Sequence, residues 1–96
     1  MITSFSDRAT QDVFDGDDTK SARRIPRTLW AVARRKLDLL NASNELLDLI
    51  VPAANRLEAL KGSLKGFHSI RINDQYRIVF RWNAGNADDV QIIDYH

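Results

Sequence analysis

The chain has 96 residues, of which 44% are hydrophobic and 28% charged, and its net charge is only +1. This composition is typical of a soluble globular protein, and residues 1–96 are interpreted as one domain. The absence of cysteine excludes disulfides and thiolate metal sites, and two histidines are too few for a histidine-based zinc site without carboxylates.

No segment of the sequence has the pattern of an export signal or a membrane span. Residues 1–6 lack the basic start and apolar run of a signal peptide. No apolar stretch approaches the roughly 18 residues that are needed to cross a bilayer. We therefore expect a cytoplasmic protein without membrane contact.

Charge is distributed unevenly along the chain. Residues 1–19 contain five acids and one base, whereas residues 20–36 contain seven bases and no acid. Residues 56–81 contain six bases and two acids. Such segments can create a positive surface that attracts phosphates, although separate solvated faces are an equally good interpretation.

The first half of the chain predicts helices. Residues 2–5 can form a short edge strand, and residues 7–14 a short helix that Asp7 caps. Residues 28–40 have helical periodicity, because Leu29, Ala33, Leu37 and Leu40 recur on one face. A shorter helix with several leucines is expected to end at Ile50 and to be capped by Asn41 or Ser43.

In the second half of the chain, apolar and polar residues alternate with a period of two. This alternation predicts strands over residues 56–60, 68–72, 76–82 and 90–95. Residues 73–75 and 83–86 are the expected turns. Because helices come first and hairpin-connected strands second, the predicted fold class is α+β. We expect the helices to cover the apolar face of a mainly antiparallel sheet and to leave the other face open.

The predicted open face presents Ser69, Arg71, Arg77 and Arg81. Arginine offers a planar and permanently charged fork that suits phosphate oxygens, so these residues are candidates for RNA or phosphate binding. A solvent-exposed face with cross-strand charge pairs would have the same pattern.

The consecutive residues Asp94, Tyr95 and His96 combine an acid, a phenol and an imidazole at the end of the last strand. A histidine can act as general acid or base, and a tyrosine can donate a hydrogen bond to a phosphate. Strand alternation predicts that Tyr95 and His96 point to opposite faces unless the chain bends. A frayed terminus is the alternative interpretation.

Further candidates lie in the first predicted hairpin, which joins residues 56–60 to residues 68–72. Glu58 is a general base or half of a surface ion pair, and Lys61 and Lys65 either guide RNA or keep their loop soluble. We assign His68, Trp30 and Trp82 to structural positions.

Several motifs resemble those of the HigB toxins of the RelE superfamily, also called plasmid-maintenance killer proteins. The resemblance runs through the whole chain. The residues that carry it are Met1-Ile2-x-Ser4-Phe5, Asn55-Arg56-Leu57-Glu58-x-Leu60-x-Gly62, Ser69-Ile70-Arg71-Ile72-Asn73-Asp74-Gln75-Tyr76-Arg77-Ile78-x-Phe80 and Asp94-Tyr95-His96.

This resemblance implies a RelE-like fold and ribosome-dependent cleavage of messenger RNA by attack of the ribose 2′-hydroxyl, without a metal or other cofactor. It also implies a HigA-like antitoxin with a helix-turn-helix domain, through which the complex binds operator DNA. A non-catalytic module that binds RNA or the antitoxin is the alternative function.

The resemblance also implies roles for individual residues. Asp94, Tyr95 and His96 match the family's C-terminal functional residues, and Arg77 matches an arginine that contacts the scissile phosphate. Lys61 and Arg71 fall where relatives have further basic groups. Glu58 departs from the pattern, because some relatives have histidine there. Two assignments therefore stay open, with Glu58 as base and His96 as acid, or His96 as base assisted by Tyr95.

Overall fold

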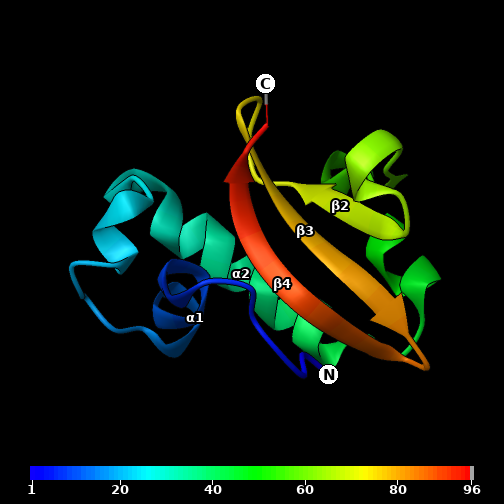
Figure 1. Ribbon diagram of the computed structural model, residues 1–96, viewed down its shortest axis with the longest axis horizontal. Helices are drawn as coiled ribbons and strands as arrows, with labels where there is room; N and C mark the ends of the chain where they lie inside the picture. The colour runs from blue at the N-terminus through cyan, green and yellow to red at the C-terminus, as the bar shows by residue number, and fades with distance from the viewer. Residues whose placement is uncertain (96) are drawn as a thin grey trace.

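The computed structural model describes residues 1–95, and within them two α-helices and five short 3₁₀ helices accompany a four-stranded sheet (Figure 1). The elements are α1 (Arg8–Asp15), η1 (Ala22–Arg24), η2 (Arg27–Leu29), α2 (Trp30–Ala42), η3 (Leu46–Ile50), η4 (Ala53–Asn55), β1 (Glu58–Ala59), η5 (Gly62–Leu64), β2 (Phe67–Arg71), β3 (Tyr76–Asn83) and β4 (Asn86–Asp94). No helix in this part of the chain is long and apolar enough to cross a membrane.

Both predicted α-helices are present. Asp7 caps α1 as expected, because its carboxylate accepts a hydrogen bond from the Thr10 backbone N–H at 2.7 Å. Gly16 ends α1 with a φ of +80°, a left-handed conformation that glycine adopts without strain. The helix predicted over residues 28–40 is confirmed, although its first turn is the 3₁₀ helix η2.

The expected shorter helix is η3, a 3₁₀ helix with a different cap from those predicted. Glu45 is its N-cap residue, and Asp48 completes a reciprocal capping box. Asn41 and Ser43 do not cap it: the Asn41 side chain accepts from the Ile2 backbone N–H, and the Ser43 hydroxyl donates to the Leu39 carbonyl. Both cap predictions were therefore wrong.

All strand pairs in the sheet are antiparallel, in the order β1-β2-β3-β4. This arrangement confirms the predicted α+β fold class. Strand β1 is shorter than predicted, because Arg56 adopts a left-handed φ of 46° that breaks an extended strand. Strand β4 is longer than predicted, and residues 2 and 5 form isolated parallel bridges to it at the edge.

The helices cover one face of the sheet, with α2 passing behind the strands in Figure 1. The core between them contains Leu37 and Leu40 from α2 and Ile70, Ile78 and Phe80 from the central strands. Trp30 and Trp82 are half-buried and pack against this core, and the His68 ring stacks on Phe80. The predicted structural positions of Trp30 and Trp82 are therefore confirmed. His68 packs as expected, but its Nδ1 is buried without a hydrogen-bond partner within residues 1–95.

Candidate functional site

Two arginines lie opposite each other where β2 ends and β3 begins. Arg71 and Arg77 are direct partners in the antiparallel register, so their side chains leave the same face of the sheet. Like charges in directly opposite positions destabilise a sheet. The pair therefore concentrates positive charge at one end of the open face, at a cost to stability.

Both guanidinium groups already have polar partners. Arg77 donates to the backbone carbonyls of Asn73 and Tyr76, the second at 3.2 Å. Arg71 forms an ion pair with Asp74, whose side chain is 96% exposed. These partners are neutral or solvated, so an incoming phosphate can replace them at modest cost.

Tyr95 lies on the same face, against Arg77. The Arg77 guanidinium carbon is 5.6 Å from the centre of the Tyr95 ring, a distance typical of a cation–π contact. The Tyr95 backbone N–H donates to the Gln75 carbonyl at 2.7 Å. The Gln75 side chain donates to the Asp94 carboxylate at 2.9 Å. Residues 94 and 95 are thus tied to the β2–β3 turn rather than frayed.

The β2–β3 turn is held by Asn73. The Asn73 side-chain oxygen accepts hydrogen bonds from the backbone N–H groups of Gln75, at 2.9 Å, and Tyr76, at 2.7 Å. Its backbone carbonyl accepts from Arg77. Asn73 therefore links Arg77 to the residue that holds Asp94 and Tyr95, and we regard it as a positioning residue of the site.

Lys36 of α2 is a further cation at this end, and no sequence pattern predicted its place there. Its ammonium donates to the Arg71 carbonyl. Burial, followed by the charges of Arg71, Arg35 and Arg77, lowers the pKa of Lys36 below its usual range. The helical periodicity of α2 places Lys36 one residue from core Leu37, but it does not reveal the strand end beside it.

Other predicted phosphate-binding residues lie elsewhere. Ser69 is 2% exposed, so the expectation that it is displayed on the open face was wrong. Its cross-strand partner Val79 is also buried, which makes the middle of this face apolar. Alternation placed Ser69 on the correct face but did not predict that this part of the face is covered.

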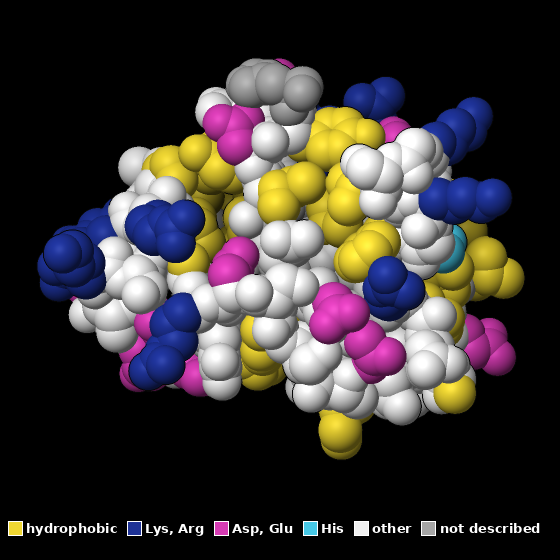
Figure 2. Space-filling view, in the orientation of Figure 1, with side chains coloured by type: hydrophobic (Ala, Val, Ile, Leu, Met, Phe, Trp, Pro, Cys, Tyr) yellow, Lys and Arg dark blue, Asp and Glu magenta, His cyan; other side chains and the backbone are white. Residues whose placement is uncertain are grey.

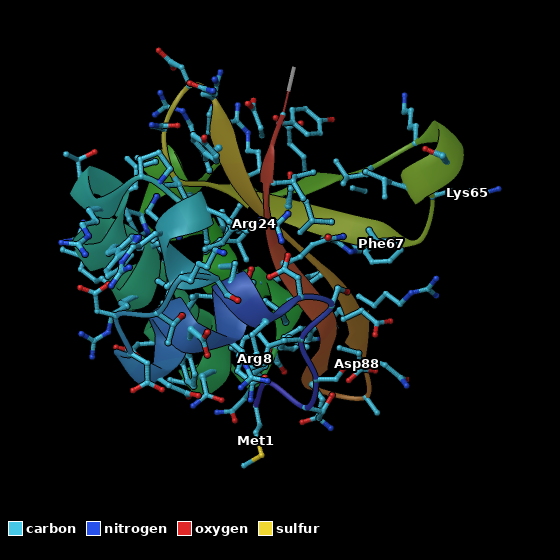
Figure 3. All side chains as sticks on the ribbon, turned by 60° about the vertical axis from the view of Figure 1, so that its left-hand side comes forward. Met1, Arg8, Arg24, Lys65, Phe67 and Asp88 are labelled. Carbon is cyan, nitrogen blue, oxygen red and sulfur yellow. The ribbon has the colours of Figure 1, made fainter. Side chains whose placement is uncertain are left out.

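Arg81, Lys61 and Lys65 lie at the opposite end of β2 and β3 from Arg77. Arg81 pairs with Phe67 at the start of β2, stacks over its ring at 4.5 Å and lies 3.5 Å from Asp89. Four residues along a strand separate Arg81 from Arg77 by about 13 Å. Figure 3 shows Lys65 beside Phe67 and pointing outward.

The arginines that were expected to converge on one region of the open face therefore lie at two ends of it. A further group of basic side chains lies over η1 and η2, at the left of Figure 2. The residues that the structure brings together are Arg71, Arg77, Asp94 and Tyr95.

Glu58 is not part of this cluster. Glu58 is exposed on β1 and pairs with Ser69, three strand spacings, or about 14 Å, from β4. His96 lies outside the described residues, as does its predicted orientation relative to Tyr95. Within residues 1–95, no three His, Cys, Asp or Glu side chains lie close enough together to hold a metal ion.

These observations define a class of protein: a small α+β domain with paired arginines and a tyrosine at one end of its sheet. Residues 3–96 match the family described as RelE-like toxin of type II toxin-antitoxin system HigB. The chain is 40% identical to Toxin HigB-1 of Vibrio cholerae over 91% of its length and 90% of that protein. It therefore belongs to the HigB-like family of type II toxins.

Two further comparisons agree with the fold. An uncharacterized protein of Haemophilus influenzae is 37% identical over 78% of this chain and 72% of its own length. Two structures of a YoeB–YefM complex from Staphylococcus aureus, one described as a heterotetrameric toxin-antitoxin complex, superpose with TM-scores of 0.60 and 0.56 at 14% identity. Each covers 100% of this chain and 98% of the matched chain, and they support the fold alone.

Proposed function

We propose that this chain is a ribosome-dependent endoribonuclease that cuts messenger RNA and is held inactive by an antitoxin. Membership of the HigB-like toxin family supports the proposal. The observation that carries it is the contact between Arg77 and Tyr95, with Arg71 directly opposite Arg77. A phosphate-binding pair thus lies beside a group that can donate a proton.

The proposed reaction is cleavage by the RNA itself. The ribose 2′-oxygen attacks the adjacent phosphorus while a base removes its proton, and the bond from phosphorus to the 5′-oxygen breaks. The leaving oxygen takes a proton from an acid, so the products are a 2′,3′-cyclic phosphate and a 5′-hydroxyl. The protein must therefore supply a base, an acid and positive charge for the crowded phosphorane.

Arg71 and Arg77 would supply the charge. Each guanidinium can bind two oxygens of one phosphate, and their opposite positions place both on one face. Asp74 is 96% exposed in its ion pair with Arg71, so a phosphate can replace it at modest cost. Arg77 would exchange two neutral carbonyls for an anion.

Among residues 1–95, we assign Tyr95 to proton transfer. Its ring lies on Arg77, so a phosphate bound by that arginine would lie within reach of the phenol. His96, which follows it, is assigned the role of base on the family resemblance. We favour this pair over Glu58, because Glu58 is separated from Tyr95 by strands β2 and β3.

The proposed partners are the translating ribosome, messenger RNA and a HigA-like antitoxin with a helix-turn-helix domain, which would bind operator DNA together with the toxin. The proposed compartment is the cytoplasm. The solved toxin–antitoxin complexes of related fold support the assignment of an antitoxin.

Cleavage of a defined message tests the proposal. Purified chain is added to the message in free form and on translating ribosomes, in the Mg²⁺ that ribosomes require, and products are mapped by primer extension. We expect cuts only on ribosomes, with 2′,3′-cyclic phosphate ends. Intact message on ribosomes, together with tight antitoxin binding, would instead establish the non-catalytic binding module.

A further inference from the structure

A pocket of about 390 Å³ opens between α2, η4 and the end of β2. Three basic side chains line it: Arg35, Lys36 and Arg71. None of the described lining residues is acidic, and all but one of the others are apolar, namely Val32, Leu39, Pro52, Ala54 and Ile72. The pocket therefore combines concentrated positive charge with apolar walls.

Two buried polar atoms in the pocket lining lack a hydrogen-bond partner within residues 1–95. Asn55 is fully buried, and its amide nitrogen donates to the carbonyls of Leu49, at 3.2 Å, and Val51, at 3.5 Å, which leaves its side-chain oxygen unsatisfied. Nε of Arg71 is the second such atom. Buried polar groups are rarely unpaired, so a ligand that offers both a donor and an acceptor is indicated.

The state of Lys36 supports an anionic ligand. Its ammonium is partly buried beside other cations, and within residues 1–95 it donates a hydrogen bond only to the neutral Arg71 carbonyl. An anion in the pocket would offset the repulsion between Lys36, Arg35 and Arg71. A carboxylate or a phosphate would meet this requirement equally well.

The surface beside the pocket favours a protein over a nucleic acid. Leu47, Ile50 and Val51 are 68%, 50% and 73% exposed, and they form an apolar patch that continues into Pro52 of the pocket wall. Adjacent large apolar side chains at a surface indicate a contact with another protein. A peptide also supplies backbone N–H groups, and the Asn55 side-chain oxygen can accept a hydrogen bond from one of them.

We propose that this pocket binds an acidic side chain of the antitoxin between Arg35, Lys36 and Arg71, while flanking apolar side chains of the antitoxin cover Leu47, Ile50 and Val51. The inference rests on the antitoxin partner of the proposed function. It adds the position of the docking surface and the chemistry of the segment that binds there. Because Arg71 also faces the site, the bound carboxylate would compete with RNA for this residue.

Binding measurements on the full-length chain test the proposal. The probe is the protein encoded beside this chain's gene, and its dissociation constant is measured by calorimetry at one fixed salt concentration. Arg35→Glu reverses an exposed charge in the pocket, and Val51→Ser removes an exposed apolar group. Each is expected to weaken binding at least about tenfold.

Arg34→Glu is the matched control. It makes the same charge change one residue earlier on α2, but the Arg34 guanidinium lies against Gly16 at the end of α1. We expect its affinity to stay within about twofold of wild type. Thermal melts of the three variants establish that each is folded before their affinities are compared.

Three results would overturn the proposal. Equal affinities of Arg34→Glu and Arg35→Glu would show that the antitoxin does not use the pocket, while leaving the antitoxin assignment intact. Failure of the wild-type chain to bind the neighbouring gene product would remove the partner and the inference together. If Arg35→Glu loses affinity for messages on ribosomes but keeps wild-type antitoxin affinity, the pocket binds RNA instead.

Discussion

The Arg77 guanidinium and the Tyr95 ring face each other across the end of the sheet, with 5.6 Å between the guanidinium carbon and the ring centre. Arg77 comes from the second residue of β3, and Tyr95 immediately follows β4. Both are anchored to the β2–β3 turn, Arg77 through the Asn73 carbonyl and Tyr95 through the Gln75 carbonyl. One turn thus sets the position of both side chains.

The phenol of Tyr95 is expected to take part in proton transfer. Tyr95→Phe keeps the ring that contacts Arg77 but removes the hydroxyl. We predict that Tyr95→Phe slows cleavage of ribosome-bound message at least about 100-fold, the usual effect of losing a positioned acid or base. Single-turnover rates measure this loss. A wild-type rate for Tyr95→Phe, with a slow Tyr95→Ala, would reduce the role of Tyr95 to ring packing.

Glu58 is expected to be dispensable for chemistry. It is exposed on β1, and strands β2 and β3 separate it from β4. Glu58→Gln should therefore cleave ribosome-bound message within about threefold of wild type, since an uncharged isostere leaves a surface position almost unchanged. A loss of 100-fold or more, with an altered pH profile, would restore Glu58 as the base.

Asn73 is expected to position the site through its side-chain oxygen. Asn73→Ala removes two hydrogen bonds to backbone N–H groups, which should lower the free energy of unfolding by about 1–3 kcal/mol. We also expect slower cleavage, because the turn anchors Arg77 and Tyr95. Asn73→Asp retains an acceptor in a turn-forming residue and should restore most of the rate. Equal rates for both variants would contradict this role.

The pKa of Lys36 is expected to lie below the usual range of a lysine side chain. Burial is the largest cause of its lowered pKa, and the Arg71 charge is the second. Arg71→Ala should therefore raise the Lys36 pKa, as measured by NMR titration of the side chain. An unchanged or lower value would mean that Arg71 does not act on Lys36.

The lowered pKa of Lys36 also predicts how the stability of the fold changes with pH. Because Lys36 has a lower pKa in the folded chain than in the unfolded chain, the unfolded chain binds more protons between the two values. The Lys36 contribution to the free energy of unfolding should rise with pH across this window. Denaturant titrations of wild type and Lys36→Met at several pH values would isolate that contribution, and a fall with pH would contradict it.

Much of the fold follows from local patterns in the sequence. The spacing of Leu37 and Leu40 predicted α2, and alternation around residues 73–75 predicted the hairpin that sets Arg71 opposite Arg77. Both depend on periodicities that near neighbours in the chain determine. The hydrogen bond between Tyr95 and the β2–β3 turn depends instead on the pairing of β4 with β3.

The missed features depend on contacts between distant segments. Ser69 was expected to be exposed, but alternation assigns only a face and does not show whether that face is covered. Lys36 was missed because its neighbour Arg71 is 35 residues away in sequence. The left-handed Arg56 that shortens β1 has no signal in residue type, since arginine does not favour that conformation.

Cleavage of ribosome-bound message by Arg77→Ala tests the central claim most directly. The control is Arg8→Ala, which removes an exposed arginine whose ion pair with Asp12 lies within α1 and involves no residue of the β2–β3 turn. If Arg77 binds the scissile phosphate, Arg77→Ala should cleave at least about 100-fold more slowly than wild type, and Arg8→Ala within about twofold of it. A folded Arg77→Ala that cleaves at the wild-type rate would contradict the proposed site.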